Sequence, residues 1–188
     1  MKNHIFKFLL LMAGLVCSVS SFAAGYRLGA GDEIKISVYG EPDLSYDQLI
    51  IDSSEKIDYP YLGTIDLKGK TLSQVRNMIT KGLKGDYLVD PKVTINMVKY
   101  RNIYVNGVVN APGGYEYQPG LTVQKAIALA GGFLAKYRKT KGIYLTRENE
   151  TDGMTDEQIK ELLKNKEEVD LNDIVHPGDT IYVVSSFW

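Results

Sequence analysis

Four aspartates lie in turn-like segments of the N-terminal half of the chain, where paired carboxylates could hydrolyse a glycosidic bond. They are Asp32, Asp43, Asp47 and Asp58. Glycoside hydrolysis needs two carboxyl groups that face each other across a cleft, one as acid and one as base or nucleophile. Nothing in the spacing places two of these aspartates across a cleft. We therefore predict no catalytic residue.

Other residue types that carry chemistry are sparse. The sequence has no His-Glu-x-x-His, no Gly-x-Ser-x-Gly and no complete phosphate-binding loop. Gly29-Ala30-Gly31 precedes a strand pattern, whereas a dinucleotide-binding loop precedes a helix. His176 stands beside Pro177-Gly178 and is predicted to be a turn residue. The segment 170–173 lacks the glycine and the distant glutamate of a calcium loop. We expect neither a metal nor a cofactor.

Two surface features could contact a partner or a polymer. A basic segment could meet an anionic polymer, lipid head groups or an acidic protein, or form a solvated loop. Its cations are Lys136, Arg138, Lys139 and Lys141. Phe187 and Trp188 could touch a membrane interface or a partner protein, or pack on their own sheet. The 13 tyrosines could stack on sugar rings, although most of them follow strand patterns, where tyrosine is common.

The composition excludes several classes of protein. The chain has 188 residues, of which 44% are hydrophobic and 24% charged, and its formal net charge is −1. This balance does not suit a non-specific nucleic-acid binder. The hydrophobic fraction is too high for a disordered chain. The length allows one domain or two small ones.

The first 23 residues are predicted to be a secretory signal peptide. Lys2 and Lys7 precede an apolar run over residues 8–19, and Ser21 and Ala23 are small residues at positions −3 and −1. The run is shorter than the about 20 residues that a spanning helix needs. Cleavage after Ala23 removes both lysines and Cys17, and leaves a cysteine-free chain of net charge −3. A retained amphipathic anchor is the alternative.

Cys17 offers a second alternative, lipidation. A lipoprotein signal ends in a cysteine preceded by small residues, and an acyl chain would tether the protein to a membrane. Leu15 and Val16 are bulky and fit this pattern poorly. We therefore expect no lipidation.

Strand patterns dominate the rest of the chain, and three helices interrupt them. Alternating apolar residues predict strands over residues 33–38, 57–61, 93–98, 103–109, 143–146 and 180–184, with Pro60 indicating an edge. Thr71 and Gln74 form a capping box for a helix over residues 72–83, which Gly85 can end. Thr122 caps a second helix that stops at Gly131-Gly132. A third, polar helix over residues 155–164 follows the acid-rich start of a solvated insertion.

The order of these elements indicates two units that meet near residues 99–102. The second unit reads strand, Pro-Gly loop, strand, helix, strand, insertion, strand, which suits a β-grasp. Residues 28–36 also echo residues 175–183, because each contains a Gly-Asp pair before an alternating strand. Glycine permits the turn and aspartate can bond the backbone ahead of it, so two turns of the same type explain the echo.

Several segments, taken in order, resemble the outer-membrane polysaccharide export family. Residues 26–45, 57–63 and 88–95 are similar to its export domain, and residues 105–115, 130–132 and 177–183 to a soluble-ligand-binding β-grasp (SLBB) module. The shared motif positions, which we expect to be structural, are Gly31, Asp32, Pro60, Gly63, Pro91, Gly107, Pro112, Gly113, Gly131, Gly132, Gly178 and Asp179. Residues 53–56 depart from the family, which usually has a glycine turn there.

The resemblance implies an α+β fold, in which a small mixed α/β export domain (24–100) precedes a β-grasp domain (101–188) with a polar insertion around 148–168. It implies a periplasmic, non-enzymatic component that forms or extends a homo-oligomeric conduit for exopolysaccharide or capsule, associated with the outer membrane. The implied partners are the polymer, an inner-membrane polysaccharide co-polymerase and a separate outer-membrane β-barrel. The chain is similar to short members that have one β-grasp module and no C-terminal amphipathic helix, so we expect it not to span the outer membrane itself.

Two other function classes stay open. A periplasmic glycan-binding or regulatory module would bind polymer without forming a conduit. An enzyme would change polymer length through a single essential carboxylate.

Overall fold

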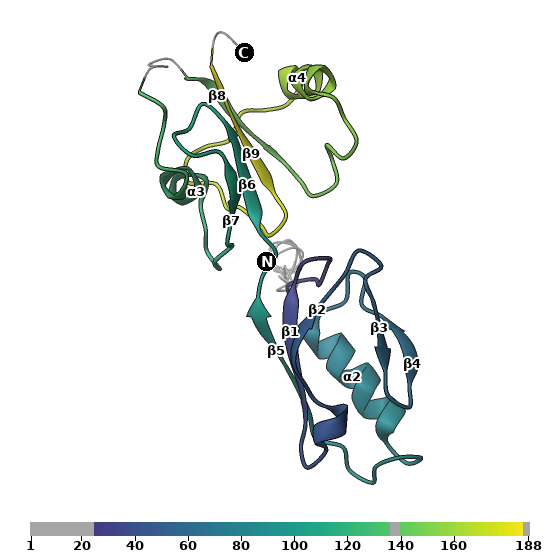
Figure 1. Cartoon of the computed structure of the whole chain (residues 1–188). Coiled ribbons are helices and arrows are strands. Elements are labelled where there is room, and N and C mark those ends of the chain that lie inside the picture. The colour runs from purple at the N-terminus through teal and green to yellow at the C-terminus, as the bar shows by residue number, and fades with distance from the viewer. Residues whose placement is uncertain (1–24, 136–139, 186–188) are drawn as a thin grey trace, which may run out of the picture.

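The computed structural model describes residues 25–135 and 140–185 (Figure 1). Its buried hydrophobic residues form two separate main cores. We refer to residues 25–100 as the N-terminal part and to residues 101–185 as the C-terminal part. The fold is α+β. In chain order the elements of the N-terminal part are β1 (Glu33–Val38), η1 (Pro42–Leu44), β2 (Tyr46–Ile50), β3 (Lys56–Tyr59), β4 (Gly63–Asp66), α2 (Leu72–Leu83) and β5 (Val93–Lys99). Those of the C-terminal part are β6 (Ile103–Gly107), β7 (Gly113–Tyr115), α3 (Val123–Leu129), β8 (Thr140–Thr146), α4 (Asp156–Lys164) and β9 (Thr180–Ser185).

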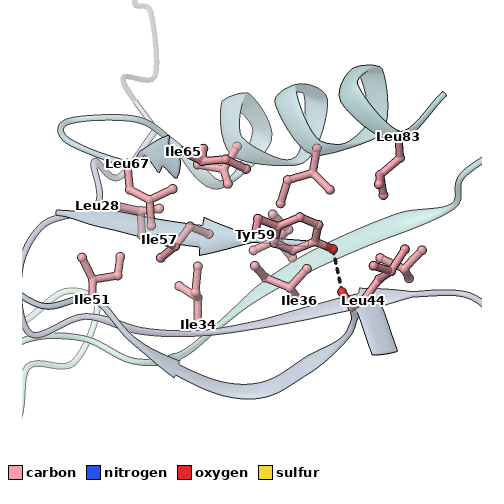
Figure 2. Packing of buried hydrophobic residues seen from close by; sticks show 14 residues of the cluster. Leu28, Ile34, Ile36, Leu44, Ile51, Ile57, Tyr59, Ile65, Leu67 and Leu83 are labelled. Atoms are coloured by element: carbon pink, nitrogen blue, oxygen red, sulfur yellow. Dashed lines mark hydrogen bonds between the residues drawn. The ribbon is translucent and has the colours of Figure 1, made fainter. Parts of the chain in front are cut away.

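The N-terminal part packs an antiparallel sheet of order β2-β1-β5 against the β3-β4 hairpin and α2. Ile34 and Ile36 of β1 are fully buried and point toward Ile57 and Tyr59 of β3 (Figure 2). The predicted capping box of α2 is present: the side chain of Thr71 accepts from the backbone of Gln74, and the Gln74 side chain accepts from the Thr71 N–H. The buried face of the helix consists of Val75, Ile79 and Leu83.

One prediction for the N-terminal part needs correction, and two strands were missed. β3 ends at Tyr59 and not at residue 61, because Pro60 and Tyr61 form the turn that returns the chain into β4. β2 and β4 were not predicted. Only Ile65 of β4 is buried, so that strand carries no apolar alternation. At the departure from the family's glycine turn, Glu55 itself adopts a φ of +53°.

The C-terminal part is a mixed sheet of order β7-β6-β9-β8, in which β6 and β9 run parallel. Figure 1 shows α3 on one face of this sheet and α4 on the other. Alternate residues of β9 point to opposite faces of the sheet. Ile181 and Val183 belong to the core that includes α3, whereas Tyr182 and Val184 pack with Leu163 of α4. This arrangement is the β-grasp expected from the order of elements, with the insertion as an additional layer.

The C-terminal part corrects one expectation and agrees with another. β6 ends at Gly107, so the predicted strand over 103–109 is too long, and Val109 instead forms an isolated bridge with Phe133. The insertion is largely exposed, as its composition indicates, with Leu163 as its buried residue; Glu148 and Glu150 in it form ion pairs. Within the described residues, no helix has the length and apolarity needed to cross a membrane.

Candidate functional site

The two Gly-Asp pairs that echo each other in the sequence form the same turn. Gly31 and Gly178 have φ values of +87° and +86°, a backbone region open to glycine at no steric cost. Oδ2 of Asp32 accepts the N–H of Gly29 at 2.9 Å, and Oδ2 of Asp179 accepts the N–H of His176 at 2.8 Å. His176 is thus a turn residue, as its neighbours in the sequence indicated.

Each of these aspartates is buried and is paired with an arginine. Asp32 is 0% exposed and Asp179 is 2% exposed. Nη1 of Arg101 lies 2.9 Å from Oδ2 of Asp32, and Nη1 of Arg147 lies 2.5 Å from Oδ2 of Asp179. A buried carboxylate is tolerated only when it is paired and hydrogen-bonded, so the arginines complete the two turns. Sequence reasoning missed both arginines, because neither lies within a motif.

Arg101 also joins the two parts of the molecule. Its Nη2 lies 2.9 Å from Oε2 of Glu148 at the start of the insertion, while Nη1 contacts Asp32 and donates to the Tyr26 hydroxyl at 2.8 Å. Its guanidinium carbon lies 5.6 Å from the centre of the Tyr26 ring, within cation–π range. The Gly178 N–H donates to the carbonyl of Asn102 at 3.0 Å. We call Tyr26, Asp32, Arg101, Glu148 and Gly178 the junction.

Because the glycines near the junction have no side chains, Arg101 can occupy the space beside them. A Cβ on Gly178 would lie 3.0 Å from Nε of Arg101, and a Cβ on Gly31 would lie 3.2 Å from its Cβ. A Cβ on Gly29 would lie only 2.7 Å from Nη1. The Arg101 side chain is 15% exposed. The two turns therefore meet across one arginine, and a side chain at Gly29 would force its guanidinium to move.

Burial dominates the electrostatics of the junction. It raises the pKa of Glu148 even though Arg101 beside it acts in the opposite direction. Burial, followed by the hydrogen bond to Asp32, raises the pKa of the Tyr26 hydroxyl, which therefore stays protonated and donates to Asp32 at 2.7 Å. Burial likewise raises the pKa of Asp179, and Arg147 and His176 offset this only in part.

A polar cavity of about 440 Å³ lies beside the junction. Both parts of the chain line it, with side chains that include Lys99, Asn102, Tyr104, Arg147, Asn149 and Asp152. Cations, carboxylates and amides are mixed along its wall. The junction carboxylates Asp32 and Glu148 share the guanidinium of Arg101, which suits them to hold two units together.

The remaining motif residues do not converge. Pro60 and Gly63 flank the β3-β4 turn, Pro91 precedes β5, and Gly107 ends β6. Pro112 and Gly113 lie at the start of β7, and Gly131 and Gly132 follow α3. These residues sit at turns and strand ends. Of the candidate contact residues, Lys136, Arg138, Lys139, Phe187 and Trp188 lie outside the described residues, as does the side chain of Lys141.

The four aspartates considered for catalysis are dispersed. Asp32 is held in the junction, Asp47 pairs with Lys35 at 2.6 Å, and Asp58 accepts from Thr64 at 2.7 Å. Asp43 lines a different hollow, at η1. Among the described residues, no cluster of three or more histidine, cysteine, aspartate or glutamate side chains could hold a metal ion.

Fold and junction together define a class: a two-unit α+β protein in which an N-terminal sheet-and-helix unit is fixed to a β-grasp unit. Comparison with known families finds one match in each unit. Residues 21–98 match the model of the polysaccharide biosynthesis/export proteins, and residues 102–157 match the model of the SLBB domain. The chain therefore contains a polysaccharide biosynthesis/export domain followed by an SLBB domain.

Curated relatives carry names from exopolysaccharide production and export. The chain is 32% identical over 139 residues to the exopolysaccharide production protein ExoF of Rhizobium meliloti (strain 1021), a match covering 66% of this chain and 32% of ExoF. It is 30% identical over 150 residues to the EPS I polysaccharide export outer membrane protein EpsA of Ralstonia nicotianae, covering 66% of this chain and 39% of EpsA. The match thus spans a third to two fifths of the length of these relatives.

Proposed function

We propose that this protein is a periplasmic component of an exopolysaccharide or capsule export machine, and that it forms or extends an oligomeric conduit toward the outer membrane. The observation that carries the proposal is the ordered pair of an export domain and an SLBB domain, locked together by Arg101. A conduit assembled from many subunits needs each subunit to present its two domains in one relative orientation. The contacts of Arg101 with Asp32 and Glu148 supply such a constraint.

The rest of the assignment follows from this role. We propose that residues 1–23 direct secretion and are removed, that residues 24–100 form the export domain, and that residues 101–188 form the β-grasp domain. The partners are the polymer, further copies of the chain, an inner-membrane polysaccharide co-polymerase and an outer-membrane component. The protein supplies a path for the polymer and catalyses no reaction. It needs neither a cofactor nor a metal. The names of ExoF and EpsA support polysaccharide as the cargo.

The test is a clean deletion, followed by separate measurement of surface-exposed and cell-retained polysaccharide. Loss of surface polymer together with accumulation inside the envelope is expected, and re-expression of the intact chain should restore export. If surface polymer persists with altered length or timing, the conduit is wrong and a sensing or processing role takes its place. A chain that stays monomeric, both alone and with its partners, would contradict the oligomeric conduit.

A further inference from the structure

The end of the N-terminal part that faces away from the junction carries an unassigned hollow. It has a volume of about 400 Å³, within the range of roughly 300–1,000 Å³ that ligand pockets have. Three segments build it: the chain around η1, the β3-β4 turn and the loop after α2. Its lining residues are Glu41, Asp43, Leu44, Pro60, Tyr61, Asp86, Tyr87 and Leu88. We call it the distal hollow.

Two stacked tyrosines form one wall of the distal hollow. The ring centres of Tyr61 and Tyr87 lie 4.7 Å apart with an interplanar angle of 27°, and the residues remain 65% and 47% exposed. An aromatic pair that is packed on itself yet open to solvent offers a flat apolar face that needs no reordering when a ligand stacks on it. The C–H face of a pyranose ring has the matching shape and polarity.

The backbone holds Tyr61 in a conformation that tyrosine rarely adopts. Its φ is +66°, a region where glycine and asparagine are the favoured residues. A β3-β4 turn selected only for stability would carry one of those residues at this position. Non-glycine residues held in such regions cluster at functional sites, and here the strained residue is the one that presents its ring.

Both tyrosines are attached to well-fixed backbone. The N–H of Leu62 donates to the carbonyl of Tyr59, and the N–H groups of Tyr87 and Leu88 donate to the carbonyl of Leu83 at the end of α2. Tyr59 is in turn anchored by its hydroxyl to the carbonyl of Leu44 at 2.6 Å. The wall and the floor of the hollow are therefore positioned by the core of the N-terminal part.

The polar groups of the distal hollow are carboxylates without partners. Glu41, Asp43 and Asp86 make no side-chain hydrogen bond and no ion pair with any described residue. Ionised carboxylates accept hydrogen bonds and donate none, so they suit hydroxyl or ammonium groups. They repel an anionic polymer.

We propose that the distal hollow binds one or two sugar units of a neutral or amine-bearing polysaccharide, stacked on the Tyr61–Tyr87 pair and hydrogen-bonded to the carboxylates. This inference rests on the proposed export function and specifies the class of polymer. Both rings of the site are open to solvent, so contact is weak and exchanges rapidly. A polymer that must keep moving through a conduit requires contact of this kind.

The experiment is a titration of the isotopically labelled protein with three tetrasaccharides, followed by amide NMR: cellotetraose, the glucosamine tetramer and the galacturonic acid tetramer. Binding of the first two is expected, with amide shifts confined to residues 41, 43, 44, 61 and 86–88, and no binding of the acidic tetramer. Tyr61→Asn removes the ring at a position where asparagine suits the backbone, and should weaken binding by about tenfold or more. Tyr87→Ala should do the same.

Tyr39→Ala is the matched control, because Tyr39 is 84% exposed and does not line the hollow; its binding should equal that of the unchanged protein. The inference is overturned if no tetrasaccharide binds, if Tyr61→Asn leaves binding unchanged, or if the acidic tetramer binds as well as the neutral one. It is also overturned if Tyr61→Asn dissociates an oligomer without saccharide, since the hollow is then a contact between copies.

The deletion experiment separates this inference from the proposed function. Failed export in the deletion strain, with saccharide binding insensitive to Tyr61→Asn, overturns the distal hollow alone. Normal export in the deletion strain, with binding that depends on Tyr61, overturns the conduit and leaves a glycan-binding protein.

Discussion

Arg101 holds Asp32 twice: its backbone N–H donates to Oδ1 at 2.9 Å, and its guanidinium Nη1 lies 2.9 Å from Oδ2. Asp32 immediately precedes β1 and Arg101 follows β5, so the pair closes one end of the N-terminal sheet. The other guanidinium nitrogen reaches Glu148 in the C-terminal part. One side chain therefore stabilises a turn and also fixes the unit that follows it.

Replacement of Arg101 by methionine tests this double role. Arg101→Met leaves the Asp32 carboxylate buried without a counter-charge, and breaking a buried pair in this way costs about 3–5 kcal/mol. Urea unfolding should show that loss in the free energy of unfolding. Small-angle scattering should show a wider range of orientations between the two parts, because the contact with Glu148 is lost as well.

Arg76→Met is the matched control, since Arg76 is exposed on α2; a change within about 0.5 kcal/mol is expected. The double variant Arg101→Met with Asp32→Asn removes both charges and should recover part of the lost stability. Equal urea midpoints for Arg101→Met and Arg76→Met would show that the junction does not hold the molecule together.

Asp179 should make stability depend on pH in a characteristic direction. Burial raises its pKa above the ordinary value of 3.8, so the carboxyl binds its proton more tightly in the folded state than in the unfolded chain. The stability gained from that preference is present below the unfolded pKa and is lost as pH rises through the folded pKa. Asp179→Asn mimics the neutral form. Its stability relative to the unchanged protein should therefore increase as the pH of urea unfolding is raised from acid toward neutral.

Asp47→Asn supplies a control of opposite sign. Lys35, by hydrogen bond and by charge, lowers the pKa of Asp47, so ionisation of this carboxylate favours the folded state and the benefit is lost as pH falls. The free energy of unfolding of the unchanged protein should therefore increase relative to that of Asp47→Asn as pH rises. If the Asp179 and Asp47 variants show slopes of the same sign, the account of Asp179 is wrong.

Gly107 is the motif glycine with the strictest requirement for the absence of a side chain. Its φ is +94°, and a Cβ there would lie 2.0 Å from the carbonyl oxygen of Val183 in the paired strand β9. Gly107→Ala must shift backbone at the centre of the β-grasp sheet, and should cost at least about 2 kcal/mol of unfolding free energy. Chemical denaturation measures this loss directly.

Gly113→Ala is the comparison, because Gly113 is also a motif glycine but nothing lies within 4 Å of its added Cβ. A change within about 0.5 kcal/mol is expected. A similar large loss for both variants would mean that the space at Gly107 is not what matters.

Local patterns predicted the elements whose own residues set them. Strand β1 and helix α2 follow from apolar periodicity, and the Thr71 capping box follows from its spacing. Apolar periodicity did not predict the elements whose structure depends on a neighbouring strand. β4 has a single buried residue and is a strand only because β3 pairs with it, and Tyr61 continued the alternation of β3 although the chain had already turned.

The candidate site was predictable in part. The repeated Gly-Asp pairs carry a local turn signal, so Asp32 and Asp179 could be singled out. Arg101 and Arg147 lie 69 and 32 residues from the aspartates they bind, and a single sequence contains nothing that links them. The distal hollow is likewise assembled from three segments that only the fold brings together.

Tyr59 connects the core of the N-terminal part to the distal hollow and carries the final prediction. Its ring is 2% exposed, and burial raises its pKa to about 12, so the hydroxyl stays protonated and donates to the Leu44 carbonyl (Figure 2). Tyr59→Phe keeps the ring but leaves that carbonyl without its partner, which should cost about 1–2 kcal/mol in urea unfolding. Tyr39→Phe, at an exposed ring, should cost nothing measurable. If the Tyr59 variant is equally stable, the hydrogen bond does not anchor η1, and the floor of the distal hollow is held by packing alone.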